Sequence, residues 1–484
     1  MENSNYERAQ VLATAEATTH EEIRRLLNIE KLKHCFECGI CTASCSMAEL
    51  LGEDYNPRGL LGKIFLNAED ALSSHELWLC AWCYKCYRRC PQALEVPEIF
   101  LVMRTIAVKR GCLNPIEKAL QKVARNVPLP LVVTLVCLHP ERVGLNIQDI
   151  LEKIRDKRTK PKTRKALKDD ECKVAVLGSG PAGLTVAYEL VQRGYPITVF
   201  ESLPELGGML RKCIPEHRLP RDILEEELCF LSNLGVEFKV NVHVGKDLSF
   251  NSLWDKSYKA IFVGVGAHKS QKLKIEGEDL EGVVNALDFL WRVKNGVNVA
   301  LGKNVAVIGG GNVAVDAART ALELGAENVT IFYRRSKAEM PANPWEVKEA
   351  EGTGVKMEFL TAPKRILGED GRISAIEFIR MKLGELDESG RRKPLPIEGS
   401  EFVFKADTVI LAIGETPDLE FLPKDVVLNE DGTIWVNPIT METSMRGVFA
   451  GGDVVTGPAS VIEAICAGKR AANSIDRYLK AEGA

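Results

Sequence analysis

The chain has 484 residues, enough for about three domains of ordinary size. Its 63 Lys and Arg residues nearly balance 67 Asp and Glu residues, for a net charge of −4. Because nucleic-acid binding normally needs a basic face, this balance gives no support to such a role.

The amino-terminal segment, residues 1–20, contains no apolar stretch of the secretory type, so no export signal is expected. The longest nearly unbroken apolar run, LPLVVTLVCL at residues 129–138, is too short to cross a bilayer, which takes roughly 20 residues. We therefore expect a cytoplasmic protein without a membrane span, in which residues 129–138 form a buried helix or strand.

Eight of the 14 cysteines form two copies of the pattern C-x2-C-x2-C-x3-C. The cytosol keeps thiols reduced, so this pattern favours an inorganic cofactor over disulfides. In two-cluster ferredoxins the fourth cysteine of such a run binds the other cluster. Structural zinc is the alternative, but zinc ligands usually come as two CxxC pairs separated by a longer loop. We expect one [4Fe–4S] cluster on Cys35, Cys38, Cys41 and Cys90 and a second on Cys80, Cys83, Cys86 and Cys45.

Both cysteine runs, HCFECGICTASC and WLCAWCYKCYRRCPQALEVPEI, together with NPRGLLGKIFL between them, resemble the small iron–sulfur subunit of heterodisulfide reductases. That resemblance implies a helical carrier of two clusters, which we place at residues 1–112, with a helix over 92–111. Residues 113–170 are expected to be a helical connector ending in a basic linker. Four aromatic residues are expected to shield the clusters from water: Trp78, Trp82, Tyr84 and Tyr87.

From residue 172 the sequence changes to strands that alternate with helices, which predicts parallel sheets. In KVAVLGSGPAG a strand, a glycine turn and a helix start follow one another, and Gly178, Gly180 and Gly183 form GxGxxG. Such a turn lets a pyrophosphate sit on the helix N-terminus. Glu201 ends the next strand, where a carboxylate can accept both ribose hydroxyls but would repel a 2′-phosphate.

A distant segment indicates that the first loop binds a flavin. GVFAGGD, residues 447–453, predicts a strand ending in Asp453, which can bind a ribityl chain. A helix is expected to begin near Ser460 and Val461 and to stabilise negative charge on a reduced isoalloxazine.

A second glycine loop, Gly309–Asn312, opens another strand–turn–helix unit. The following strand ends in Arg334 and Arg335 where the first unit has Glu201. Two guanidinium groups suit a 2′-phosphate, which predicts NADP(H) here and FAD at the first loop. An exposed basic turn without a ligand is the alternative.

With ELGGML, IPEHRLP, YRRSKAEMPA, AIGETPD and GVFAGGDVVTGPASVIEAICAGKRAA added to both loops, residues 171–484 resemble the small subunit of NADPH-dependent glutamate synthase. They are similar too to the FAD subunit of ferredoxin-linked, electron-bifurcating transhydrogenases and to the flavin half of dihydropyrimidine dehydrogenase. The resemblance implies two Rossmann-type α/β domains, an FAD domain at 171–290 and 405–484 split by an NADP(H) domain at 291–404. It also implies FAD contacts at Gly178, Gly180, Pro181, Ala182, Glu201, Gly208, Leu210, Arg218, Val244, Asp453 and Val461, and NADP(H) contacts at Gly311, Asn312, Val313, Arg334, Arg335, Ala412, Ile413 and Gly414.

These features predict an oxidoreductase subunit that exchanges a hydride with NADP(H) at FAD and single electrons through two clusters with a partner subunit or ferredoxin. An electron-bifurcating complex is one setting that the resemblance implies. Alternatives are a glutamate synthase small subunit and a non-catalytic electron relay. No catalytic side chain is assigned, because hydride transfer needs no acid–base group. Cys213 has no partner in a CxxC or CxxxxC pattern, so thiol–disulfide chemistry is not predicted.

Overall fold

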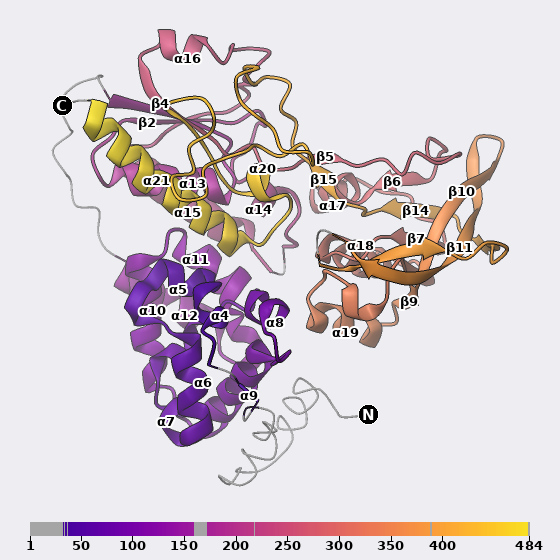
Figure 1. Cartoon of the computed structure of the whole chain (residues 1–484), viewed down its shortest axis with the longest axis horizontal. Helices are drawn as coiled ribbons and strands as arrows, with labels where there is room; N and C mark the ends of the chain where they lie inside the picture. The colour runs from indigo at the N-terminus through magenta and orange to yellow at the C-terminus, as the bar shows by residue number, and fades with distance from the viewer. Residues whose placement is uncertain are drawn as a thin grey trace. The chain divides into compact units, whose positions relative to one another are not determined.

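The computed structural model describes residues 37–158, 172–216, 218–387 and 390–482, together with Leu32, His34 and Cys35. Most of the predicted basic linker, from residue 159 onward, therefore lies outside the described residues. The chain divides into two compact units. Unit 1 contains the described residues up to Gly266 and from Leu419 onward, and unit 2 spans Ala267–Asp418 (Figure 1).

The amino-terminal part of unit 1 is a group of helices, coloured indigo to purple in Figure 1. Asn56 begins α6 by accepting a hydrogen bond from Gly59 N, which satisfies one of the free N–H groups at the helix start. The predicted helix over 92–111 is confirmed as α9, Val96–Lys109, most of whose side chains are buried. The helices are α4 (Ile40–Ala43), α5 (Ser46–Leu51), α6 (Pro57–Leu66), α7 (Ala68–Leu72), α8 (Lys85–Arg89), α9, α10 (Asn114–Asn126), α11 (Pro130–Val133) and α12 (Ile147–Lys157).

Residues 129–138 are buried, as predicted, and they are helical. The short helix α11 continues directly into a turn of π-helix, Thr134–Leu138. All nine residues from Pro130 to Leu138 are buried, so the run serves as core of unit 1. Among the described residues, no helix combines the length and the apolarity that crossing a bilayer would require.

The rest of unit 1 is built on a five-stranded parallel sheet with the order β16-β4-β1-β2-β3. Strand β16, from the carboxyl-terminal segment, pairs with β4, so residues on both sides of unit 2 complete one sheet and the predicted split of this domain is confirmed. The strands are β1 (Lys173–Leu177), β2 (Ile197–Phe200), β3 (Glu237–Lys239), β4 (Tyr258–Val263) and β16 (Val448–Ala450).

Helices accompany this sheet, and two of them, α13 and α21, pack closely together. A Cβ on Gly468 of α21 would come within 2.5 Å of the Ala182 carbonyl oxygen of α13, so a glycine is needed at this approach. The helices are α13 (Pro181–Val191), α14 (Met209–Lys212), α15 (Arg221–Asn233), α16 (Ser252–Asp255), α20 (Asp453–Thr456) and α21 (Val461–Glu482).

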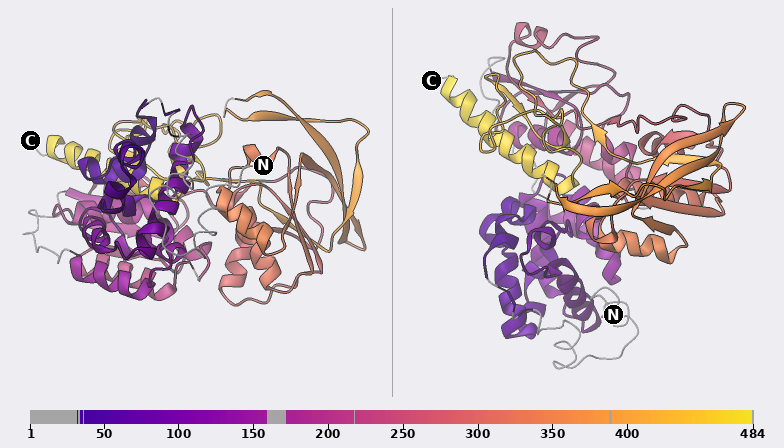
Figure 2. Two further views of the ribbon diagram at one scale, coloured as in Figure 1. Left: turned by 90° about the horizontal axis from the view of Figure 1, so that it is seen from below. Right: turned by 45° about the vertical axis from the view of Figure 1, so that its right-hand side comes forward.

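Unit 2 has three layers: helices, a parallel sheet and an antiparallel sheet (Figure 2). The parallel sheet has the order β6-β14-β7-β8-β9, with β6 (Val283–Asn285), β14 (Thr408–Leu411), β7 (Asn304–Ile308), β8 (Asn328–Tyr333) and β9 (Lys356–Phe359). The antiparallel sheet is formed by β10 (Thr361–Glu369), β11 (Arg372–Leu386), β12 (Arg392–Pro396) and β13 (Phe402–Lys405). The helices are α17 (Ala286–Lys294), α18 (Asn312–Glu323) and α19 (Pro344–Gly352), and β5 (Lys269–Ser270) pairs with β15 (Glu415–Thr416).

An aromatic core joins the two sheets of unit 2. Phe332 of β8 stacks on Phe378 of β11 with 4.0 Å between ring centroids. The limits expected from the sequence, 291 and 404, leave out β6 and β14, although both strands pair within this sheet. The unit is wider than expected because these two strands carry no glycine motif that would mark them as part of it.

Candidate cofactor sites

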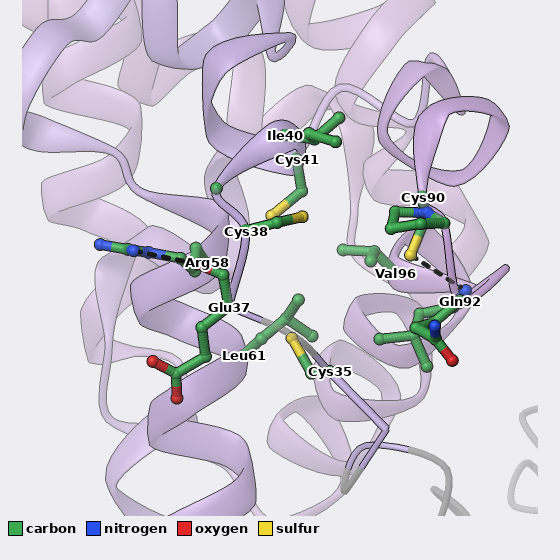
Figure 3. A pocket seen from close by; sticks show the side chains of 13 residues that line it. Cys35, Glu37, Cys38, Ile40, Cys41, Arg58, Leu61, Cys90, Gln92 and Val96 are labelled. Atoms are coloured by element: carbon green, nitrogen blue, oxygen red, sulfur yellow. Dashed lines mark hydrogen bonds between the residues drawn. The ribbon is translucent and has the colours of Figure 1, made fainter.

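Cys35, Cys38, Cys41 and Cys90 line one cavity. Figure 3 shows their four sulfur atoms facing this space, three from the first cysteine run and one from the second. The Cys90 sulfur accepts a hydrogen bond from Leu94 N at 3.4 Å. We call these four residues the outer set, because Cys38 is exposed to solvent.

Cys45, Cys80, Cys83 and Cys86 line a second cavity. We call them the inner set, since Cys80 is buried. Tyr55, Trp82 and Tyr84 also line this cavity, which gives two of the four predicted shielding aromatics a place beside it. The structure thus groups the eight cysteines crosswise, in the combination expected from their spacing.

The two cysteine runs share an unusual backbone conformation. Glu37 and Trp82 occupy the same place in their respective runs, and both have positive φ, at 52° and 47°. Gly39 and Tyr84 also correspond, with φ of 76° and 56°. Left-handed residues among right-handed ones turn successive N–H groups toward one side, which makes a concavity for anionic atoms. In both runs, the backbone therefore curves around a space that can hold a group bound by the cysteine thiolates.

The inner thiols lie in an environment that opposes their ionisation. Burial raises the pKa of Cys45 to about 12, and Cys80 and Cys83 add to the increase. Burial also raises the pKa of Cys83 to about 11. Because a bound metal deprotonates its thiol ligands, these cysteines fit residues whose charge is neutralised by iron.

The first glycine loop lies between β1 and α13, as predicted. Gly178 has φ +97°, and a Cβ there would come within 2.5 Å of Gly264 O. A Cβ on Gly183 would meet Gly178 O at 2.0 Å. Gly180, by contrast, is the N-cap of α13 with φ −70°, and no atom lies within 4 Å of a Cβ there. The loop therefore has two glycines that packing requires and one that leaves space for a ligand.

This difference separates the effects of two substitutions. Gly178→Ala should destabilise unit 1 by at least about 2 kcal/mol, because it adds a left-handed backbone penalty to a backbone clash. Gly180→Ala should change the unfolding free energy of the FAD-free protein by less than about 0.5 kcal/mol. It should nevertheless weaken FAD binding by about tenfold or more, because its methyl group would occupy the open space where a pyrophosphate is expected. Thermal unfolding and flavin fluorescence titration measure the two effects; unchanged FAD affinity in Gly180→Ala would contradict the assignment.

Glu201 directly follows β2 and is 6% exposed. Its Oε2 accepts hydrogen bonds from Ser179 N at 3.0 Å and Ser179 Oγ at 2.6 Å. Its Oε1 accepts from Leu203 N at 2.9 Å. These donors hold the carboxylate at the end of the strand, beside the glycine loop.

The other expected FAD contacts lie on or next to helices that accompany the parallel sheet of unit 1, apart from Val244. Gly208 lies against the loop, since its Cβ would be 3.0 Å from the Gly180 Cα. Asp453 begins α20, and its Oδ1 accepts from Ala459 N at 3.2 Å. Val461 begins α21, so the helix start predicted near this residue is confirmed. Pro181 and Ala182 open α13, Leu210 is in α14, Arg218 precedes α15 and Val244 is in a bridge with Leu248.

The start of α21 is tied to the inner cysteine set by side chains that the sequence did not single out. Glu463 accepts a hydrogen bond from Ser460 Oγ at 2.8 Å, and its other oxygen pairs with Lys85 Nζ at 2.9 Å. Lys85 lies between Cys83 and Cys86. One turn further along α21, Cys466 Sγ donates to the carbonyl oxygen of Ser46, the residue after Cys45.

The second glycine loop lies in unit 2 between β7 and α18. Gly309 has φ +148°, and a Cβ there would be 2.1 Å from Ala412 O. Gly311 is the N-cap of α18, and no atom lies within 4 Å of a Cβ on it. Asn312 and Val313 open the helix, whereas Ala412, Ile413 and Gly414 follow the adjacent strand β14, so these expected contacts share one edge of the sheet.

Arg334 and Arg335 both follow β8, but the structure gives them different surroundings. Arg335 is 5% exposed, its Nε donates to Arg392 O at 2.8 Å, and its Nη2 pairs with Asp387 Oδ2 at 2.6 Å. Arg334 is exposed, and partial desolvation together with the charges of Arg335 and Arg391 lowers its pKa. Arg334 is therefore the better placed of the two to meet a phosphate, and Arg391 contributes to the same positive region.

The sequence matches the pyridine nucleotide-disulphide oxidoreductase family over residues 172–468 and a 4Fe–4S dicluster domain over residues 31–94. The chain belongs to the pyridine nucleotide-disulphide oxidoreductase family. The FAD, NADP(H) and two [4Fe–4S] clusters expected from the sequence agree with these two matches. The chain is therefore an oxidoreductase that joins a pyridine-nucleotide flavoprotein to a dicluster domain.

Several relatives in this family are named as parts of larger enzymes. The chain is 48% identical over 311 residues to the NADP(+)-dependent formate dehydrogenase subunit beta of Moorella thermoacetica, which covers 64% of this chain and 44% of that protein. It is 38% identical over 442 residues to the NADPH-Fe(3+) oxidoreductase subunit beta of Geobacter sulfurreducens, covering 82% and 63%. The glutamate synthase [NADPH] small chain of Escherichia coli is 37% identical over 325 residues, covering 64% and 69%. The chain thus spans between 44% and 63% of the length of the first two relatives.

Among solved structures of the family fold, FprA from Mycobacterium tuberculosis in complex with NADPH is similar with a TM-score of 0.55. The two chains are 22% identical, and the match covers 64% of this chain and 85% of FprA. At this identity the likeness concerns the fold alone.

Proposed function

We propose that the chain oxidises NADPH, or in reverse reduces NADP⁺, at FAD and exchanges single electrons with a partner redox protein through two [4Fe–4S] clusters. FAD, when bound, converts between a two-electron hydride and single electrons. The observation that carries the proposal is the ion pair between Lys85 and Glu463. Lys85 lies between Cys83 and Cys86 of the inner cysteine set, and Glu463 lies on α21. This ion pair puts the candidate flavin helix and the candidate cluster site in direct contact within one compact unit.

For FAD, we assign the pyrophosphate to the Gly178–Gly183 loop and the ribose hydroxyls to Glu201. The amide groups at the start of α13 favour an anion, as do the N–H groups at the start of α21. Glu201 is held by Ser179, so its carboxylate is oriented before a ligand arrives. The assigned residues are Gly178, Gly180, Pro181, Ala182, Glu201, Gly208, Leu210, Arg218, Val244, Asp453 and Val461.

For NADP(H), we assign the pyrophosphate to Gly311, Asn312 and Val313 at the start of α18. Ala412, Ile413 and Gly414 line the neighbouring strand end. Arg334 is assigned to the 2′-phosphate, and Arg335 is assigned mainly to holding the turn between β11 and β12 through Asp387. A guanidinium that is already paired and buried has fewer free donors for a second anion.

For the clusters, we assign one to the outer set and one to the inner set. Four cysteine sulfurs around each cavity suit the ligand number of a [4Fe–4S] cluster. The inner set lies next to α21, and the outer set includes the exposed Cys38. We therefore propose that electrons pass between flavin and partner through the inner set first and the outer set second.

The partner is proposed to be another redox subunit or a ferredoxin. A partner subunit is supported by the names of the relatives, which are called subunit beta or small chain. Electron bifurcation would require a second acceptor on such a partner.

The function is tested by adding NADPH anaerobically to the chain loaded with FAD, iron and sulfide. NADPH should bleach the flavin absorbance and then produce the electron paramagnetic resonance signals of reduced clusters. NADH should act at least about tenfold more slowly, since it lacks the phosphate that Arg334 would bind. A reduced flavin beside clusters that stay oxidised would contradict the electron route, and a flavin inert to both nucleotides would contradict the proposal.

A further inference from the structure

Arg104 is a completely enclosed cation beside the inner cysteine set. It lies on α9 and is 2% exposed. Its Nε donates to Leu77 O at 2.7 Å, its Nη2 to Cys80 O at 2.9 Å and its Nη1 to Leu138 O at 3.1 Å. All three acceptors are neutral carbonyl groups, so the hydrogen bonds fix the guanidinium in place without neutralising it.

Two aromatic rings lie close to the guanidinium group of Arg104. The guanidinium carbon of Arg104 lies 5.9 Å from the ring centroid of Trp78 and 5.9 Å from that of Trp82. Within the part of the chain that the structure describes, no acidic side chain forms an ion pair with Arg104. A buried charge without an opposite charge is strongly unfavourable, so a compensating anion is expected close by.

The nearest candidates for this anion are the cysteines of the inner set, as thiolates. Arg104 reaches this set directly, because its Nη2 donates to the carbonyl oxygen of Cys80 and its guanidinium lies beside Trp82, which lines the same cavity. The buried Tyr55 lines the same cavity. The buried Glu98 lies on the same helix as Arg104, and its carboxylate accepts a hydrogen bond from the hydroxyl of Tyr84.

Among the described residues that line the cavity of the outer set, there is no comparable buried cation. Arg58, which lines its cavity, is exposed and donates to Glu37 O at 3.3 Å. Water and salt screen an exposed charge far more than a buried one. The two sites therefore differ in the charge that acts on them.

We infer that Arg104 is the charge-compensating residue of the inner set and raises the reduction potential of a cluster held there. Reduction adds one electron, and hence one negative charge, to a group that thiolates already make negative. A fixed buried cation stabilises the reduced state more than the oxidised state. This inference rests on the cluster assignments of the proposed function. Arg104 is thus a tuning residue that makes the inner site a better electron acceptor from the flavin side.

The test is a redox titration of the full, cluster-loaded chain, followed by electron paramagnetic resonance. Arg104→Met removes the charge but keeps an unbranched apolar side chain, and Arg104→Lys keeps the charge. Arg110→Met is the matched control, since Arg110 follows the same helix but pairs at the surface with Glu69 at 2.7 Å. We expect a lower midpoint for the inner cluster in Arg104→Met, a smaller shift in Arg104→Lys, and unchanged outer-cluster and flavin midpoints. Arg110→Met should match the unaltered chain.

Loss of the inner cluster from Arg104→Met alone, with Arg104→Lys retaining it, would also support charge compensation. Equal shifts or equal cluster loss in both variants would overturn the inference, because the hydrogen bonds and not the charge would then matter. Unchanged midpoints in both would overturn it too. Were the unaltered chain to hold fewer than two clusters, the cluster assignments themselves would fail, which iron and sulfide analysis detects separately.

Discussion

The double variant Cys38→Ser/Cys90→Ser is expected to lose about half of its iron and sulfide and to keep one intact cluster. The two replaced residues come from different cysteine runs, yet both line the outer cavity. If each run bound its own cluster, the same variant would damage both clusters. The prediction therefore discriminates directly between crossed and uncrossed ligation.

The matched control replaces two cysteines from one run. Cys38→Ser/Cys45→Ser should damage both clusters, because Cys45 lines the inner cavity while Cys38 lines the outer one. Iron and sulfide analysis, with electron paramagnetic resonance of the reduced protein, measures the outcome. Retention of one cluster in this control, together with loss of both in the first variant, would reverse the assignment.

The second large effect is expected at the NADP(H) loop. Arg334→Ala should raise the KM for NADPH by about tenfold to a hundredfold, because a charge-assisted hydrogen bond to phosphate contributes about 1.5–3 kcal/mol. The KM for NADH should hardly change, since NADH lacks the 2′-phosphate. Steady-state kinetics with an artificial electron acceptor measures both constants.

Arg335→Ala provides the contrast. Removing a buried guanidinium leaves Asp387 and the Arg392 carbonyl without their donor, which should lower the unfolding free energy by about 2–4 kcal/mol. Thermal unfolding should show this loss, whereas Arg334→Ala should unfold close to the unaltered chain. An equal rise in KM for NADPH and NADH in Arg334→Ala would refute a phosphate-binding role.

Much of the fold could be predicted because its signals are local. At turns such as Gly178 and Gly309, a positive φ and a close backbone neighbour together require glycine, so these turns are visible in the sequence. The spacing of eight cysteines likewise carries the crossed grouping that the structure shows. The boundaries of unit 2 could not be predicted as well, because β6 and β14 join its sheet through pairing between distant segments.

The roles of single charged side chains could not be predicted for a related reason. Arg334 and Arg335 are adjacent in sequence, and only the return of the β11–β12 turn brings Asp387 to one of them. Arg104 looks like any polar residue of a helix until Leu77, Cys80 and Leu138 are seen to surround it. Pairing partners that lie dozens of residues away leave no mark in a local pattern.

The crosswise grouping of the cysteines has a consequence for biosynthesis. Each cavity takes cysteines from both runs, so the inner set is complete only when Cys86 has left the ribosome and the outer set only when Cys90 has. A nascent chain arrested between the two runs would present at most three outer-set thiols and a single inner-set thiol. If the assigned ligand sets hold, a complete four-cysteine site therefore forms only after the two cysteine runs have folded against each other.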